Sequence, residues 1–192
     1  MTEEINQPFP RAYVEIDALT KSSGFTMASD VQTCSLLRTL AATKPAGKFL
    51  ELGTGTGLST SWILDGMNNN ASLISIDNDP TFLEIARSKL GSDNRLQLLQ
   101  FDGNEWITAN ADQRFDYIFA DTWHGKYLLL DETLSMLNTG GLYIIDDMLP
   151  QPNWPEGHDE KARNLIDLLE KRSDLLLTKM IWATGIIVAV KK

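Results

Sequence analysis

Three glycines alternate with threonines in this chain, at Gly53, Gly55 and Gly57. An apolar run precedes them, and residues that can form a helix follow from Leu58. A glycine-rich turn between a strand and a helix lets backbone amides approach a ligand closely. Open α/β sheets place such a turn at the carboxyl end of a buried strand, where they bind small molecules. This stretch therefore predicts a small-molecule site.

The spacing of the glycines argues against a dinucleotide as the ligand. A dinucleotide fingerprint reads G-x-G-x-x-G. Here the third glycine falls one position early, at Gly57, and Leu58 takes the expected place. A nicotinamide-dependent oxidoreductase is therefore disfavoured.

Acidic residues stand at or just after the ends of the first four expected strands. They are Glu51, Asp77, Asp102 and Asp121. In a parallel sheet these ends share one edge, so the four side chains are aimed at one crevice, and Asp77 could hold both hydroxyls of a ribose. Any single acid could instead cap the helix that follows, because aspartate is a favoured N-cap residue. The coincidence of all four with a glycine turn favours a shared ligand.

The pattern E-x-G-x-G-x-G-x-S over residues 51–59 resembles motif I of class I S-adenosylmethionine-dependent methyltransferases. The order of the later features resembles the same family from about residue 26 to the C-terminus. The resemblance implies S-adenosylmethionine as the cofactor, bound by residues from four strand ends. These residues are Glu51, Gly53, Gly55, Gly57, Ser59, Asp77, Asn78, Asp102, Gly103, Asp121 and Trp123.

The resemblance also implies a role for each part of this set. The three glycines line the methionine portion of the cofactor, and Ser59 hydrogen-bonds its carboxylate. Asp77 holds the ribose hydroxyls, with Asn78 beside the adenine. Asp102 and Gly103 border the adenine ring.

A second polar group follows the fourth and fifth expected strands. Asp121 precedes Trp123 and His124, and the pair Asp146-Asp147 ends the fifth strand. This arrangement resembles the catechol O-methyltransferase-like family of metal-dependent O-methyltransferases. It implies a divalent cation, Mg²⁺, on Asp121, Asp146 and Asp147, and Trp123 near the adenine. His124 stands where that family has its lysine base, so His124 and Asp121 are the expected catalytic residues.

Methyl transfer to oxygen gives these residue types a purpose. S-adenosylmethionine carries a good leaving group, so the enzyme has to supply a nucleophile and hold it in line. A hard cation lowers the pKa of a hydroxyl and orients it, while a base accepts the proton. Three carboxylates leave room on Mg²⁺ for a bidentate vicinal diol.

Two positions depart from the family pattern. Asp147 replaces an asparagine, which adds negative charge and changes metal preference or affinity. His124 replaces the lysine. With an ordinary pKa of about 6.5, histidine accepts a proton without strong desolvation. Its alternatives are a further metal ligand or a helix cap, and the three acids could also be purely structural.

Other residues are weaker candidates for function. His158, in a proline-rich linker, is expected to be exposed, and Lys126 is expected to be a solvated helix residue or to steer an anionic substrate. Trp154 is a candidate wall for a planar acceptor. Met27 and Ser29 resemble the family's segment that folds over the methionine end.

Strand and helix signals alternate along most of the chain. Strands are expected over 48–52, 72–77, 96–101, 115–121 and 141–146, with a closing hairpin of 175–181 and 186–190. Helices are expected over 58–64, 81–90, 127–137 and 159–171. This alternation predicts an α/β fold, a Rossmann-like doubly wound, mostly parallel seven-stranded sheet with a C-terminal antiparallel hairpin.

The N-terminal part is expected to differ from the rest. Residues 1–28 read as an arm with a short helix around Tyr13–Leu19, and residues 29–192 as one methyltransferase domain. Ser29 and Gln32 have the spacing of a capping box for the helix that follows. The arm is shorter than in many bacterial relatives of this type, so a homodimer is left open.

Composition narrows the partners. A length of 192 residues suits one domain, and a hydrophobic content of 43% is ordinary for a globular protein. The net charge of −9 argues against nucleic acid as a binding partner. Cys34 is the only cysteine, so no intrachain disulfide can form and a reducing compartment is expected. No apolar run approaches the ~20 residues of a membrane helix, and the acidic N-terminus lacks a signal-peptide core, which predicts a cytoplasmic protein without a membrane partner.

The sequence therefore predicts an O-methyltransferase that moves a methyl group from S-adenosylmethionine to a hydroxyl of a small, catechol-like molecule with a divalent cation. One alternative is a metal-independent methyltransferase that uses His124 as base. The other is a non-catalytic S-adenosylmethionine-binding protein.

Overall fold

Strands and helices alternate along the chain in the computed structural model, which describes residues 8–152 and 154–192. The strands are β1 (Lys48–Leu52), β2 (Ser72–Asp77), β3 (Leu96–Gln100), β4 (Phe115–Ala120), β5 (Leu137–Ile145), β6 (Leu175–Met180) and β7 (Ile186–Lys191). The helices are α1 (Tyr13–Ser23), α2 (Val31–Ala42), α3 (Leu58–Gly66), α4 (Pro80–Leu90), α5 (Gly103–Ala109), α6 (Leu130–Ser135) and α7 (His158–Glu170).

The seven strands form one sheet in the order β3-β2-β1-β4-β5-β7-β6. The first five strands are parallel to one another. Strand β7 runs antiparallel between β5 and β6, so β6 and β7 form the closing hairpin. This topology confirms the predicted doubly wound, mostly parallel sheet with a C-terminal antiparallel hairpin.

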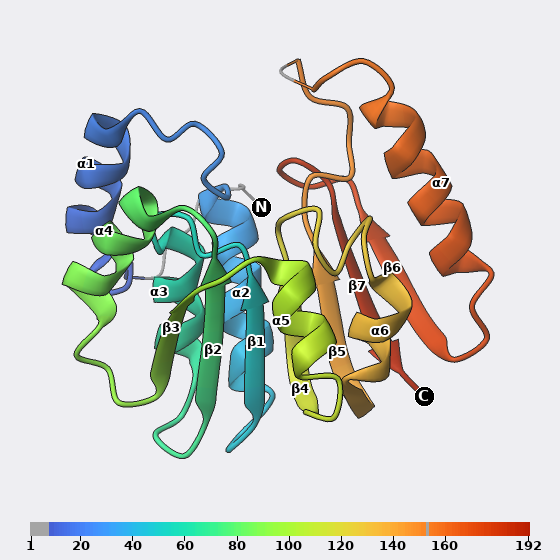
Figure 1. Cartoon of the computed structure of the whole chain (residues 1–192), viewed down its shortest axis with the longest axis horizontal. Coiled ribbons are helices and arrows are strands. Elements are labelled where there is room, and N and C mark those ends of the chain that lie inside the picture. Colours follow the sequence, from blue (N-terminus) through green and yellow to red (C-terminus); the bar gives the residue numbers. More distant parts are fainter. Residues whose placement is uncertain (1–7, 153) are drawn as a thin grey trace.

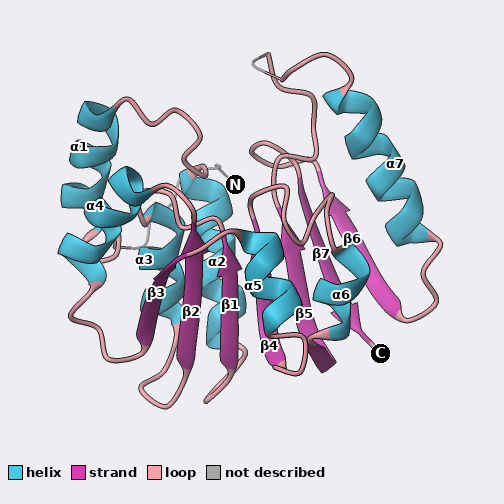
Figure 2. Cartoon of the chain, viewed as in Figure 1, coloured by secondary structure: helices cyan, strands magenta, loops and turns pink. Residues whose placement is uncertain are grey.

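Helices cover both faces of the sheet (Figures 1 and 2). Helices α5, α6 and α7 pack on one face, against alternate strand residues such as Leu50 and Ile118. Helices α2, α3 and α4 pack on the other, against the intervening residues Phe49 and Tyr117. Because both faces are buried, consecutive positions of the central strands are apolar, such as Phe49 and Leu50 in β1 and residues 117–120 in β4, as is typical of parallel sheets.

The described part of the predicted arm packs against this second layer. Helix α1 lies beside α3 and α4. Thr20 and Thr56 share a hydrogen bond of 2.7 Å, and Lys89 on α4 pairs with Glu15 at 2.7 Å. The division into an arm over 1–28 and a domain over 29–192 stays a prediction, and residues 1–7 of the arm lie outside the described residues.

Three local predictions are wrong. Helix α2 begins after Asp30, and the Ser29 hydroxyl donates to Asp121 instead of capping a helix. The helix expected over 127–137 starts only at Leu130, because the chain first makes a tight loop with Leu129 in the left-handed region at φ 54°. The fifth strand starts at Leu137, with a register shift against β4. Helix α5, with 7 residues, was not predicted, because it is too short to show helical periodicity.

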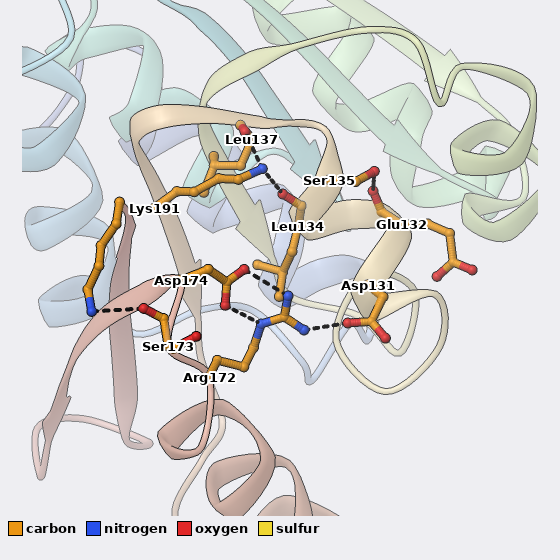
Figure 3. A network of polar contacts seen from close by, with 10 residues as sticks. Asp131, Glu132, Leu134, Ser135, Leu137, Arg172, Ser173, Asp174 and Lys191 are labelled. Atoms are coloured by element: carbon orange, nitrogen blue, oxygen red, sulfur yellow. Dashed lines mark hydrogen bonds and ion pairs between the residues drawn. The ribbon is translucent and has the colours of Figure 1, made fainter.

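Polar contacts join the elements at the end of the sheet away from the glycine turn (Figure 3). Arg172, just after α7, binds Asp174 at 2.9 Å and also Asp131 on α6. Lys191 donates to the backbone oxygens of Leu134 and Leu137 at 2.8 Å each, where α6 ends and β5 begins. These contacts join α6, α7 and the hairpin at the end of the sheet that holds none of the predicted site residues. In the described part of the chain, no helix is both long and apolar enough to span a lipid bilayer.

Candidate functional site

A pocket opens where β1, β2, β3 and β4 end. Its lining residues come from all four strand ends and are Leu52, Gly53, Ile76, Asp77, Asn78, Phe101, Gly103, Thr122 and His124. Five of the predicted site residues therefore lie around one hollow. Thr122, Phe101 and the two aliphatic residues were not among the predicted ones, although their positions next to strand-end acids could have indicated them.

The glycine turn approaches the neighbouring strand ends closely. Gly53 has φ 106°, and a Cβ atom there would overlap the Thr122 methyl group. The Gly55 amide donates to Asp77 Oδ2 at 2.7 Å, which ties the turn to the end of β2. A Cβ at Gly55 would lie 2.9 Å from the Phe25 ring, so the segment before α2 covers the turn. The turn thus has no room for side chains on the surface that faces its neighbours.

Gly57 contacts α4 in the structure. A Cβ at this position would lie 2.9 Å from Ala86 Cβ and 3.1 Å from Leu90 Cδ1. Its φ of 91° also belongs to the left-handed region that favours glycine. Gly57 therefore lets α3 begin close to α4, and its predicted contact with a cofactor stays a prediction.

Glu51 is fully buried behind the glycine turn. Its carboxylate accepts hydrogen bonds from Ser59 Oγ and Thr60 Oγ1 at 2.6 Å each, and from Ser75 Oγ at 2.5 Å. Burial raises the pKa of Glu51 to about 7, although the three hydroxyls act in the opposite direction. The Ser59 hydroxyl donates to Glu51, and the predicted cofactor contacts of Glu51 and Ser59 stay predictions.

Glu51→Gln is expected to remove part of the pH dependence of stability. Between an unfolded pKa near 4.5 and a folded pKa of about 7, the folded protein keeps a proton that the unfolded chain releases. The stability due to Glu51 is therefore lost as pH rises through this window, by about 3 kcal/mol in total. We expect the free energy of unfolding of the wild type, minus that of the variant, to fall from pH 5 to pH 8 in urea titrations. A pH-independent difference would contradict the buried, protonated Glu51.

The predicted adenine side brings Asp102, Gly103 and His124 together. Asp102 Oδ1 caps α5 by accepting from the amides of Asn104 and Glu105, and its Oδ2 lies 3.6 Å from His124 Nε2. A Cβ at Gly103 would lie 2.6 Å from the His124 side chain. The His124 ring also lies 3.2 Å from Thr122 Oγ1 through Nδ1. His124 thus contacts residues at the ends of β3 and β4, and no hydrogen bond within the described residues joins it to Asp146 or Asp147.

The three predicted metal ligands lie around the ends of β4 and β5. Asp121 Oδ2 accepts from Ser29 Oγ at 2.8 Å. Asp146 Oδ1 accepts from Thr184 Oγ1 at 2.6 Å and from the Asp147 amide at 2.8 Å. Burial, together with the neighbouring acids, raises the pKa of Asp121 well above its ordinary value, and burial raises that of Asp146 to about 6.

Lys126 lies among these acids, which corrects the prediction of a solvated helix residue. It precedes α6 in a loop closed by the bond from the Gly125 amide to the Leu128 oxygen. Its side chain is 4% exposed, and its Nζ donates to the backbone oxygen of Asp146 at 2.5 Å. Burial lowers the pKa of Lys126, while Asp121, Asp147 and Asp146 raise it. The pattern of charged residues in the sequence does not indicate that Lys126 is buried among acids.

The three acids do not form a metal site in this arrangement. One carboxylate oxygen of Asp121 and one of Asp146 already accept hydrogen bonds, and the ammonium group of Lys126 lies beside the acids and supplies a positive charge. Within residues 8–152 and 154–192, no group of three His, Cys, Asp or Glu side chains is arranged to hold a metal ion.

Aromatic side chains gather beside this acidic edge. His158 is 7% exposed, so the prediction of an exposed histidine is wrong. Its ring lies 4.5 Å from that of Trp154, 5.3 Å from Tyr127 and 5.8 Å from Trp123. Trp123 packs here, outside the lining of the pocket, and its predicted place near the adenine stays a prediction. Trp154, a predicted acceptor wall, belongs to this aromatic group.

Comparison with known proteins agrees with the fold and with the glycine turn. A family described as "Methyltransferase domain" matches residues 50–148. A curated protein from Mycobacterium ulcerans named "Putative O-methyltransferase" is 29% identical over 118 residues, which cover 58% of this chain and 52% of that protein. The chain therefore spans about half the length of the curated relatives it matches.

Solved structures resemble the chain over nearly its whole length. An O-methyltransferase from Bacillus cereus in complex with SAH has a TM-score of 0.85 at 17% identity, covering 98% of this chain and 94% of that one. The O-methyltransferase TomG from Streptomyces achromogenes, in complex with SAM, has a TM-score of 0.83 at 19% identity, with 98% and 92% covered. At these identities the likeness establishes the fold.

Proposed function

This chain belongs to the methyltransferase domain family, and from that premise we propose that it transfers a methyl group from S-adenosylmethionine to a hydroxyl of a small molecule. The observation that carries the proposal is the pocket formed by four successive strand ends, with Asp77 and the Gly53 turn in its lining. Open α/β sheets bind ligands at this edge. The names of the relatives support oxygen as the atom that is methylated.

The pocket residues suit the parts of this cofactor. Asp77 accepts one backbone amide on each carboxylate oxygen, from Gly55 and Asp79, and each oxygen keeps a lone pair for a ribose hydroxyl. Phe101 and Asn78 line the same hollow and could border a flat base. When bound, S-adenosylmethionine would supply the electrophilic methyl group.

The chain's own task is then to hold and activate the acceptor oxygen. The aromatic group around His158 offers flat apolar surfaces next to the acids at the ends of β4 and β5. Such surfaces favour an aromatic acceptor, of which a catechol is one kind. Help from a divalent cation was the finer sequence prediction, and because no three ligand side chains of the described residues are arranged to hold one, no step here uses a metal. His124, the predicted base, lines the pocket and stays a candidate to accept the proton.

A methyl-transfer screen tests the proposed function. S-adenosylmethionine binding is measured by calorimetry, and turnover is measured over catechols, other phenols and hydroxy acids, with and without EDTA. We expect binding at a single site and turnover on a phenolic acceptor. Tight NAD binding without S-adenosylmethionine binding would contradict the proposal, and cofactor binding without turnover on any acceptor would favour the non-catalytic alternative. A homodimer and a cytoplasmic location stay predictions.

A further inference from the structure

A buried lysine is unusual, and Lys126 is buried where the sequence predicts a metal ion. Lysine is almost never fully buried unless opposite charges compensate for its lost hydration. Here the side chain is 4% exposed, and the carboxylates of Asp121, Asp146 and Asp147 are the charges that favour its ammonium form. The ring of Tyr127, 5.2 Å from Nζ, covers another side of the ammonium group.

The acids lie around this ammonium group, and no three ligand side chains of the described residues are arranged to hold a metal ion. Asp146 presents its backbone oxygen to Nζ, while its carboxylate is held by Thr184 and the Asp147 amide. Asp121 is held by Ser29. A divalent cation would need several of these oxygens at once. The ammonium charge of Lys126 already offsets part of the negative charge of the three acids, which weakens their attraction for a further cation.

The ammonium group has donors left for a ligand. It carries three N–H bonds, and its hydrogen bond to Asp146 is the one that the described residues accept. The ammonium nitrogen lies 5.2 Å from the centre of the Tyr127 ring, and Tyr127 belongs to an aromatic group with Trp123, Trp154 and His158. An anionic oxygen on an aromatic ring matches both surfaces.

Resting on the proposed function, we propose that Lys126 replaces the divalent cation and that the acceptor is a phenol bound as its phenolate. The phenol releases its proton to solvent, so this step does not need His124 as a base, and the ammonium group of Lys126 holds the oxygen anion. A lone pair of this oxygen forms the new O–CH₃ bond while the S–CH₃ bond breaks, and the sulfur keeps that electron pair. Phenolate and sulfonium charges cancel, so the products are the neutral methyl ether and S-adenosylhomocysteine.

This proposal changes the expected acceptor. A metal ion binds a vicinal diol through two oxygens, whereas one ammonium group needs a single oxygen. Phenols without a neighbouring hydroxyl are therefore expected to react about as well as catechols. A strict requirement for two vicinal hydroxyls would contradict the proposal.

Manganese binding tests the proposal without relying on activity. Electron paramagnetic resonance of Mn²⁺ is recorded with the wild type and with Lys126→Met, and S-adenosylmethionine binding is followed by calorimetry. We expect no Mn²⁺ site in the wild type, unchanged turnover in EDTA, and an Mn²⁺ site in Lys126→Met, whose acids are released. Lys126→Met is also expected to lower kcat by about 100-fold, because removing one hydrogen-bond donor to an oxyanion has an effect of this size in other enzymes.

Lys179→Met is the matched control, because Lys179 lies on β6 with a half-exposed side chain and pairs with Glu170 of α7, which is not a site residue. It should keep wild-type kcat. One Mn²⁺ bound per wild-type chain, together with loss of turnover in EDTA, would overturn the proposal even if Lys126→Met fails to fold. If the wild type does not bind S-adenosylmethionine, the proposed function fails, while the Mn²⁺ measurement still decides the role of Lys126.

Discussion

Replacing Asp77 by alanine is expected to weaken S-adenosylmethionine binding by at least about 100-fold. Hydrogen bonds from ligand hydroxyls to a carboxylate contribute roughly 1.5–3 kcal/mol each, and the proposed ribose contact uses two of them. The substitution also releases the Gly55 amide, which Asp77 Oδ2 holds at 2.7 Å, so the glycine turn loses its anchor to β2. Calorimetric titration of the cofactor measures the change.

Asp79→Ala is the matched control for this experiment. Asp79 lies two residues away and accepts the amides of Thr81 and Phe82 as the N-cap of α4, but it is absent from the pocket lining. Losing the cap should cost about 1 kcal/mol of stability and change cofactor affinity by less than about twofold. Asp77→Asn keeps one carbonyl acceptor without the charge, and we expect its affinity to lie between those of the wild type and Asp77→Ala. Equal affinities of Asp77→Ala and Asp79→Ala would show that Asp77 does not hold the cofactor.

The sheet and the position of the pocket could be predicted because they depend on local patterns. Buried parallel strands appear in the sequence as short apolar runs, and the turn at Gly53 and the cap at Asp79 have their own residue signals. The pocket then follows from topology, because parallel strands end at one edge. Gly53, Asp77, Asn78, Gly103 and His124 meet there as the order of the elements requires.

The burial of Lys126 and His158 beside the acids at the ends of β4 and β5 could not be predicted, because it depends on the path of the chain through loops. Lys126 and His158 look like surface residues in the sequence, and both are buried. Lys126 points inward because Gly125 and Leu129 take left-handed conformations that turn the chain before α6 begins. His158 is buried because α7 brings it onto Tyr127. Such long-range packing leaves no periodic signal in the sequence.

Gly53→Ala is expected to disrupt both the fold and the pocket. A Cβ atom at this position would overlap Thr122 Cγ2 and lie 3.1 Å from the Asp121 backbone oxygen, and the φ of 106° is strained for any residue with a side chain. Backbone strain and overpacking each cost about 1–3 kcal/mol. We therefore expect a loss of about 2–4 kcal/mol in the free energy of unfolding, measured in urea, and no detectable cofactor binding at room temperature.

Two further variants separate strain from overlap. Gly140 has a φ of 75° and open space around an added Cβ atom. Gly140→Ala should therefore lower the free energy of unfolding by the backbone strain alone, about 1–2 kcal/mol. Thr122→Ser removes the overlapping methyl group and keeps the hydroxyl that bonds the His124 amide. In the Gly53→Ala background it should restore stability toward that of Gly140→Ala. If Thr122→Ser restores nothing, the requirement for glycine lies in the backbone alone. If Gly53→Ala is as mild as Gly140→Ala, the close approach of the glycine turn to the end of β4 is not what fixes this edge of the pocket.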